Sequence, residues 1–355
     1  MIKYHQLPEV CVVLLNWNGW QDTIECVETL LASNYPRFTI TIVDNGSTDS
    51  SLEKIRAWLQ RSAQDNRLSF TENICELTDK EKQAQPEMFS ATKHSMVQVV
   101  LISLAENLGF AAGSNVGARY ALASEVDYVW FLNNDTTVEP ESLSSLVHCL
   151  ESNPDVQVAT SQIRYYYTPH RIWNCGGQLQ WYGARRYFYS NADYTSAPQS
   201  GCETITFVTG CAMFVRSRLL REHGLLTEKF FFGEEDFEFS MRLKKAKILM
   251  VCCHDSIVYH KVSTSVERMA KHEWFGRIYV HYLNRFINMR TYMPPIIWHI
   301  WRILYLIYIT LLLAVKQKRP LRQVLYLWQG VWRQSMRLDS VDRQTFDQCM
   351  KHMVE

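Results

Sequence analysis

The chain has 355 residues, of which 47% are hydrophobic and 21% are charged, values that are ordinary for a globular protein. This length allows one large domain or two modest ones, with ample material for a core. The formal net charge is +1, so no overall electrostatic field recruits nucleic acid, and any binding of acidic ligands must be local.

The 10 cysteines are scattered, apart from the adjacent Cys252 and Cys253. No CxxC pair occurs, and no Cys/His spacing fits a zinc site. A strand-like run starts by Val10, so no N-terminal signal peptide is visible. We therefore expect buried, reduced cysteines in a cytosolic protein.

The first part of the chain alternates apolar β-branched runs with helical patterns. The expected strands are 10–15, 38–43, 97–103 and 128–132, and the expected helices are 22–33 (capped by Asp22), 50–61, 111–123 and a helix from Pro140 to about Asn153. This βαβα order predicts an α/β fold with a parallel sheet covered on both faces. The polar stretch 64–95 interrupts the rhythm and is interpreted as a surface insertion.

The middle of the chain, 156–208, is rich in aromatic residues and glycine and predicts short strands and loops. Two further helices are expected at 217–223, which ends at Gly224, and at 236–246. They are followed by strand-like runs at 248–252 and 257–259.

The C-terminal part contains an almost wholly apolar run, 296–315, followed by Lys316, Lys318, Arg319 and Arg322. Its length would just span a bilayer, but a single span would put this basic tail on the side opposite a cytosolic domain. An interfacial helix, with Arg302 snorkelling and Trp298, Trp301, Tyr305 and Tyr308 near headgroups, is the favoured interpretation. A buried core or dimer helix and a true span remain alternatives.

Unusual polar residues follow three of the predicted strands. The strand ends carry Asn16 and Asn18, then Asp44 and Asn45, then Asn133, Asn134 and Asp135. Ligands of an open parallel sheet bind beyond the carboxyl ends of its strands, so these side chains should share one crevice. Each of them alone would also suit an ordinary turn or helix cap.

The first strand is not followed by the GxGxxG pattern of a nicotinamide-binding fold, and the P-loop pattern is absent from the sequence. A diphosphate then needs another counter-charge, and a divalent metal held by a carboxylate supplies it. Asp135, at the end of an apolar strand, is the candidate ligand. His260, which follows a β run, would complete such a site, or is simply a satisfied histidine at a strand end.

Two other segments have candidate functional residues. Asn107, Gly109, Gly113 and Asn115 lie in a stretch where small residues recur every fourth position, a pattern that permits close approach to a ligand or tight helix-on-sheet packing. The segment 230–239 places four carboxylates among five phenylalanines. Acids in a first helical turn can simply favour the helix dipole, but a carboxylate in an apolar site gains a raised pKa and can act as a general base.

Taken together, these residues resemble family 2 glycosyltransferases, and are most similar to the rhamnosyltransferase-like branch. The resemblance covers roughly 10–265. The motifs occur in this order: Asn-Trp-Asn-Gly at 16–19, Val-Asp-Asn-Gly-Ser-Thr-Asp at 43–49, Asn-Leu-Gly-Phe-Ala-x-Gly-x-Asn-x-Gly at 107–117, Leu-Asn-Asn-Asp at 132–135, Thr-Gly-Cys-Ala-Met at 209–213, Glu-Asp-x-Glu at 235–238 and Tyr-His-Lys at 259–261.

The resemblance implies a nucleotide-binding glycosyltransferase-A (Rossmann-like) fold with a mostly parallel mixed sheet in 1–270, and a helical region in 271–355 that associates with membranes or oligomerises. It implies an inverting, metal-dependent transfer from a nucleotide-sugar donor to a glycan or lipid-linked hydroxyl. Asp44, with Asn16 and Asn18, would bind the nucleotide. Asp135 and His260 would hold Mg²⁺ or Mn²⁺.

Asp236, in the Glu235–Asp236 pair, matches the residue that deprotonates the acceptor. The leading donor is dTDP-rhamnose, by resemblance alone. The DXD-type motif is reduced to Asn-Asn-Asp, and no role is carried over to Leu283-Asn284-Arg285. We expect a cytoplasmic protein held peripherally at the inner face of the cell membrane through 296–315, with a homodimer possible. The alternatives are a non-catalytic nucleotide-sugar-binding or scaffold protein and a nicotinamide-dependent oxidoreductase.

Overall fold

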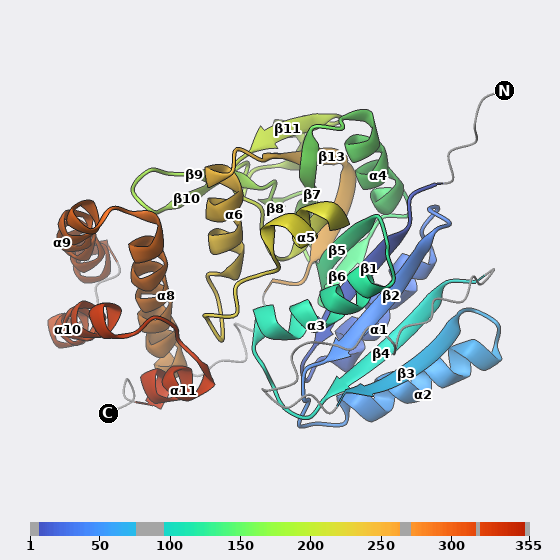
Figure 1. Ribbon diagram of the computed structural model, residues 1–355, viewed down its shortest axis with the longest axis horizontal. Helices are drawn as coiled ribbons and strands as arrows, with labels where there is room; N and C mark the ends of the chain where they lie inside the picture. The colour runs from blue at the N-terminus through green and yellow to red at the C-terminus, as the bar shows by residue number, and fades with distance from the viewer. Residues whose placement is uncertain (1–6, 76–95, 263–270, 317–319, 352–355) are drawn as a thin grey trace.

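The computed structural model describes residues 7–75, 96–262, 271–316 and 320–351. Within them a large mixed sheet runs in the strand order β11-β13-β7-β12-β5-β1-β2-β4-β3. Helices cover the sheet, and a separate group of C-terminal helices stands beside it (Figure 1). This arrangement confirms the predicted α/β glycosyltransferase-A-like architecture.

One half of the sheet is parallel. β1 (Val10–Asn16) lies between β2 (Phe38–Asp44) and β5 (Tyr128–Asn133), and β4 (Gln98–Leu104) continues the sheet beyond β2. The edge strand β3 (Ser69–Cys75) pairs with β4 inside the segment interpreted as an insertion, so that interpretation is wrong for these residues. Residues 76–95 lie outside the described part of the chain.

The other half of the sheet is mixed. β12 (Ala212–Arg216) is antiparallel to both β5 and β7 (Val156–Tyr165), while β13 (Leu249–His260) is parallel to β7 and antiparallel to β11 (Cys202–Ile205). The two short strands expected at 248–252 and 257–259 are one strand with an irregular register after Cys253. Four short strands complete the set: β6 (Thr136–Val138) on β13, β8 (Ile172–Asn174) on β7, and the ribbon of β9 (Gly177–Leu179) with β10 (Arg185–Tyr187).

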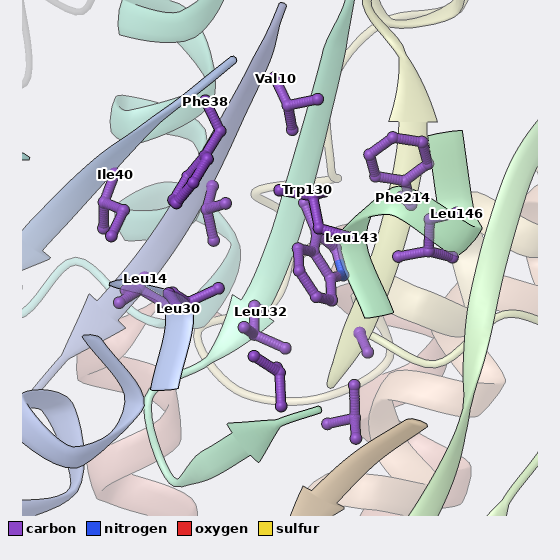
Figure 2. Close-up of a cluster of buried hydrophobic side chains, with 14 of the residues drawn as sticks. Val10, Leu14, Leu30, Phe38, Ile40, Trp130, Leu132, Leu143, Leu146 and Phe214 are labelled. Atoms are coloured by element: carbon purple, nitrogen blue, oxygen red, sulfur yellow. The ribbon is translucent and has the colours of Figure 1, made fainter. Parts of the chain in front are cut away.

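Alternating side chains of the strands separate two cores. One face packs against α1 (Trp20–Leu31), α2 (Ser51–Gln64) and α4 (Ser142–Ser152), and Figure 2 shows its centre around Leu14, Leu30, Trp130 and Leu146. The opposite face packs against α3 (Phe110–Ala123), α5 (Ser217–His223) and α6 (Glu235–Lys245). Both cores combine aliphatic with aromatic side chains, and their packing fixes the strands in place.

Two local expectations differ from the structure. Asp22 does not cap the first helix, which begins at Trp20; instead its carboxylate pairs with Lys261 Nζ at 2.6 Å. Cys149 of α4 and Cys202 of β11 form a disulfide, so the expectation of reduced cysteines is wrong for this pair. The two cysteines meet because β11 pairs with β13 and α4 packs against β13. Their spacing in the sequence does not predict these contacts.

The C-terminal region comprises α8 (Lys271–Tyr292), α9 (Pro295–Leu311), a π-helical turn (Leu312–Lys316), α10 (Leu321–Arg337) and α11 (Arg343–Lys351). These helices share a third core with Phe207, Phe230 and Phe237 of the preceding part of the chain. Residues 295–315 are long and apolar enough to cross a membrane, by length and composition only.

One side of α9 is buried against the other C-terminal helices. Trp298, Trp301 and Arg302 are at most 7% exposed, and Arg302 stacks on the Trp332 ring, 3.6 Å from its centroid, while donating to the Trp332 carbonyl. The expectation that Arg302 snorkels to headgroups, with Trp298 and Trp301 beside it, is therefore wrong, because all three side chains are buried inside the helical group. The other side of α9 exposes Ile296, Ile297, Ile300, Ile303, Leu304, Ile307 and Leu311.

Candidate active site

The carboxyl ends of three parallel strands meet at one edge of the sheet. The register pairs Asn16 with Asp44 across β1 and β2, and Leu15 with Asn133 across β1 and β5. The candidate residues at these strand ends are therefore neighbours, as the sequence predicted.

Asp44 is the centre of a buried hydrogen-bond network. Asn16 Nδ2 donates to its carboxylate at 2.7 Å, and Ser47 donates both its hydroxyl, at 2.7 Å, and its backbone N–H, at 3.0 Å. Asn18 has a positive φ of 54° and accepts from the backbone N–H of Thr48 at 2.8 Å. These hydrogen bonds connect the loops after β1 and β2 and hold the Asp44 carboxylate in one orientation.

A second amide network fixes the loop before α3. Asn45 Nδ2 donates to Asn107 Oδ1 at 3.0 Å and to the Gly109 carbonyl at 3.2 Å. Gly109 has φ +87°, and a Cβ there would lie 2.2 Å from the Phe231 carbonyl oxygen. Only glycine lets these two loops touch. Gly113 serves packing, because a Cβ would meet the Leu15 side chain at 2.6 Å.

Asn115 is buried, and its amide bonds to a different loop. It donates to the Leu226 carbonyl at 2.8 Å and to Glu228 Oε1 at 2.9 Å, and it accepts from Leu226 N–H at 3.1 Å. These contacts hold the loop that leads toward the acidic segment before α6.

Asn134 donates to Thr23 Oγ1 at 2.9 Å, and that hydroxyl donates to Asn16 Oδ1 at 2.9 Å. The end of β5 is thereby tied to the end of β1. Asn133 Oδ1, by contrast, is buried and finds no hydrogen-bond partner among the described residues. A buried orphan acceptor of this kind suits a ligand.

Asp135 and His260 come together through strand pairing. The antiparallel contact of β6 with β13 places His260 opposite Thr136, and Lys261 N–H donates to the Asp135 carbonyl at 3.0 Å. His260 Nε2 then lies 3.1 Å from Asp135 Oδ1. Two ligand atoms that share one divalent ion at about 2.1 Å lie about 3 Å apart, so the pair has the spacing of a metal site.

The His260 side chain is buried, and its polar neighbours are Asp135 and Cys211. Burial alone would lower the pKa of this imidazole, but the neighbouring Cys211 and Asp135 side chains raise it to about 10. Its ring packs edge-on against Trp173, with centroids 4.6 Å apart, and Nδ1 finds no hydrogen-bond partner among the described residues. The imidazole is therefore held by Trp173, Cys211 and Asp135.

The acidic segment opens α6. Asp236 accepts from Arg185 Nη1 at 3.2 Å, and the Arg185 guanidinium stacks 5.0 Å from the Phe207 ring centroid. Burial and the neighbouring Asp236 raise the pKa of Glu235 to about 8, so its carboxyl is protonated at neutral pH. The two adjacent carboxyl groups therefore differ: Asp236 is oriented by Arg185, whereas Glu235 is neutral.

Gly210 and Cys211 connect the acidic segment to the metal-type pair. A Cβ on Gly210 would lie 3.8 Å from Asp236 Cβ. The next residue, Cys211, accepts from Asn133 N–H at 2.8 Å and raises the pKa of His260. The turn at Gly210 and Cys211 therefore lies between Asp236, the candidate base, and the candidate metal ligands Asp135 and His260.

Sequence reasoning missed three residues that organise this site: Arg185, Asn284 and Arg285. Arg285 of α8 pairs with the buried Glu234, and Asn284 Nδ2 donates to the Phe232 carbonyl at 3.0 Å. Members of the family have an Arg-Asn pair late in the sequence, which could have indicated Asn284 and Arg285. The order of these two residues is reversed here, so no role was assigned to them. Arg185 lies in the aromatic middle segment, where no motif marks it.

Asp44, the Asp135–His260 pair and Asp236 therefore lie near the carboxyl ends of the parallel strands, at one edge of the sheet. The model of the family described as "Glycosyltransferase like family 2" matches residues 71–274, and that of "Glycosyl transferase family 2" matches residues 11–75. The chain belongs to glycosyltransferase family 2 and is a glycosyltransferase.

No curated protein matches the chain. Among solved structures, the mannosyltransferase PcManGT from Pyrobaculum calidifontis in complex with GDP-Man and Mn²⁺ is 14% identical, with a TM-score of 0.54 over 99% of this chain and 88% of that one. GalNAc-T7 with UDP, GalNAc and Mn²⁺ is 13% identical, with a TM-score of 0.56 over 98% of this chain and 56% of that one. These likenesses show a shared fold.

Proposed function

We propose that this enzyme transfers a sugar from a nucleotide-diphosphate donor to a hydroxyl of a glycan or lipid-linked acceptor, with inversion, in a reaction that requires Mg²⁺ or Mn²⁺. The observation that carries the proposal is the pairing of Asp135 with His260 at 3.1 Å beside the Asp44 crevice. Two neighbours of similar fold were solved with Mn²⁺ and with GDP-Man or UDP.

Asp135 and His260 fit a divalent ion by their spacing and by their chemistry, since carboxylate oxygen and imidazole nitrogen suit Mn²⁺ and Mg²⁺ sites that also use phosphate oxygens. The orphaned Asn133 Oδ1 belongs to the residue two positions before Asp135. When bound, the ion would neutralise charge on the departing diphosphate. Trp173 packs against the His260 ring and fixes its orientation.

The donor nucleotide is assigned to the crevice after β1 and β2. Asp44 and the amides of Asn16 and Asn18 supply the fixed acceptors and donors that a base or ribose needs. Residues 107–109 close one side of this crevice through Asn45. The resemblance to the rhamnosyltransferase-like branch makes dTDP-rhamnose the first donor to test.

Asp236 is the proposed general base. Its carboxylate would accept the proton of the acceptor hydroxyl as that oxygen attacks the anomeric carbon from the face opposite the diphosphate. Arg185 orients the carboxylate, and the protonated Glu235 beside it adds no competing charge. In this proposal the configuration inverts, because the acceptor oxygen bonds to the anomeric carbon on one face while the bond to the diphosphate breaks on the other.

A donor screen with metal tests the proposal. We expect one nucleotide sugar to raise the melting temperature only with Mn²⁺ or Mg²⁺, since ligand at 100 times its Kd adds about 2.7 kcal/mol of stability. Asp135→Asn should abolish this shift. Asp236→Asn should keep the shift and lose transfer at least ~100-fold.

The matched control is Asp155→Asn, an exposed acid outside the site. Metal-dependent donor binding with no transfer by the unaltered protein would indicate the alternative, a non-catalytic nucleotide-sugar-binding protein. Full transfer by Asp236→Asn would refute the base assignment.

We also propose that α9 rests on the inner face of the cell membrane. Its outward side is apolar, with Ile296 76% and Leu304 61% exposed, and Arg322 in the first turn of α10 is exposed as well. An apolar helix face beside basic residues binds anionic lipid surfaces. Such a contact would hold a cytoplasmic catalytic site near lipid-linked acceptors.

Sedimentation with anionic phosphatidylglycerol vesicles tests the membrane contact. Ile300→Glu with Leu304→Glu should abolish binding, and Leu7→Glu, an exposed apolar residue elsewhere, should not. A vesicle-independent dimer that the double variant converts to monomer would contradict the proposal and assign this face to a homodimer.

A further inference from the structure

Two thiols and an imidazole meet at the β11 edge of the sheet, away from the crevice. Cys175 stands just before β9, and Cys252 and His254 lie on β13. One ligand atom from each of the three lies within 4.8 Å of the other two, and all three residues are buried. The transfer reaction uses none of them.

Strand geometry explains the convergence. Cys252 and His254 are two residues apart on one strand, so their side chains point to the same face of the sheet. β11 pairs with β13 so that Glu203 stands opposite Cys252 and faces the same way. Cys202 and Cys253 face the other way, where Cys202 forms its disulfide with Cys149.

A carboxylate holds the imidazole. His254 Nε2 lies 3.3 Å from Glu203 Oε2, and Tyr189 donates its hydroxyl to Glu203 Oε1 at 3.3 Å. Nε2–H therefore donates to Glu203, and Nδ1 keeps its lone pair. Gln162 Nε2 lies 3.5 Å from Nδ1, at the outer limit of a hydrogen bond, and the Cys175 side chain also hydrogen-bonds the imidazole. Metal-bound histidines carry this same carboxylate behind the ring.

We propose that Cys175, Cys252 and His254 bind one zinc ion, with a fourth position open to water. Two sulfurs and one nitrogen form a donor set that Zn²⁺ prefers and that Mg²⁺ and Mn²⁺ avoid. Both thiols lose their protons to the solvent on binding, and no oxidant or reductant is required. The sequence pattern hid this site because Cys175 lies far along the chain from the other two ligands.

The zinc site is separate from the Asp135–His260 pair. Cys252 and His260 are eight positions apart on β13, which is about 26 Å of extended strand. The ion would tie β13 to the turn that leads into β9, and the ribbon of β9 and β10 carries Arg185 to Asp236. The ion would in this way hold the arm that orients the proposed base.

Metal analysis of the full-length protein tests the inference. After gel filtration into metal-free buffer without a chelator, we expect about one zinc per chain to remain. Cys175→Ser and His254→Asn should each lose it, whereas Cys11→Ser, another buried thiol beside a hydroxyl, should retain it. Glu203→Gln keeps all three ligands and should weaken zinc affinity about 10–100-fold.

Substitution with Co²⁺ distinguishes the two metal sites. Thiolate ligands give cobalt a charge-transfer absorption in the near ultraviolet, which Asp135→Asn should leave intact and Cys175→Ser should remove. Near-ultraviolet circular dichroism checks that each variant is folded, and Glu203→Gln keeps the test decisive if a cysteine variant is not. Recovery of a Cys175–Cys252 disulfide peptide without zinc, or equal zinc retention by Cys175→Ser, would overturn the proposal.

Discussion

Replacing Glu235 with glutamine should stabilise the folded protein at neutral pH. Burial and the neighbouring Asp236 raise the pKa of this carboxyl from 4.5 to about 8. The folded state therefore keeps a proton that the unfolded chain releases, and the stability of the unaltered protein falls as the pH rises from about 4.5 to about 8. Glutamine has no proton to lose, so the variant escapes this fall.

The magnitude follows from the separation of the two pKa values. At pH 7 the unfolded carboxyl is ionised and the folded one is not, a gap of about 2.5 pH units, or about 3 kcal/mol at 1.36 kcal/mol per unit. Free energies of unfolding in urea at pH 5, 6, 7 and 8 would measure it. The difference between Glu235→Gln and the unaltered protein should grow across this series, and Glu53→Gln, an exposed control on α2, should show no such trend.

The outcome that would refute this reasoning is a difference of the same size at pH 5 and pH 8. It would mean that Glu235 is ionised in the folded state throughout, and that Asp236 has a second negative charge beside it. The separation of roles between the two acids would then be lost.

Three other substitutions test the packing of the site. Gly109→Ala should cost about 1–3 kcal/mol in urea unfolding, because its φ is +87° and the added Cβ would strike the Phe231 carbonyl. Arg185→Lys should lower kcat about 10-fold with little change in the KM of the donor, because it removes the guanidinium that orients Asp236, and steady-state kinetics separate the two effects. Thr23→Val should cost about 2 kcal/mol in unfolding free energy, because its buried hydroxyl joins the loops after β1 and β5.

The strand-end residues were predictable because their placement depends on local patterns. Apolar runs separated by amphipathic helices specify parallel strands, and parallel strands put their carboxyl ends on one edge. Asn16, Asp44 and Asn133 follow from that rule, and the register confirms that they are neighbours. No long-range information was needed.

The remaining contacts depend on pairings between distant segments. His260 meets Asp135 only because β6 pairs with β13, and no local sequence pattern predicts that pairing. The prediction that both residues hold the metal relied on the family resemblance. Arg185 reaches Asp236 from a ribbon that packs outside the main sheet. Burial of Arg302, likewise, depends on a stacking partner in α10 that the apolar pattern of α9 does not specify.

The C-terminal helices contact the segment that leads into α6. Glu234 adopts a left-handed φ of 75° immediately before α6, a conformation that costs a non-glycine residue about 1 kcal/mol or more. Arg285 and Asn288 of α8 hold its buried carboxylate there, and Arg285 also covers the Phe237 ring at 3.6 Å. The position of Glu234 sets where α6 begins, and hence where Asp236 stands. A division of the chain at residue 270 would cut through this contact. Helix α8 also packs against α9, whose outer face is proposed to rest on lipid. Helix α8 therefore connects α9 to the start of α6, the helix that contains the proposed base Asp236.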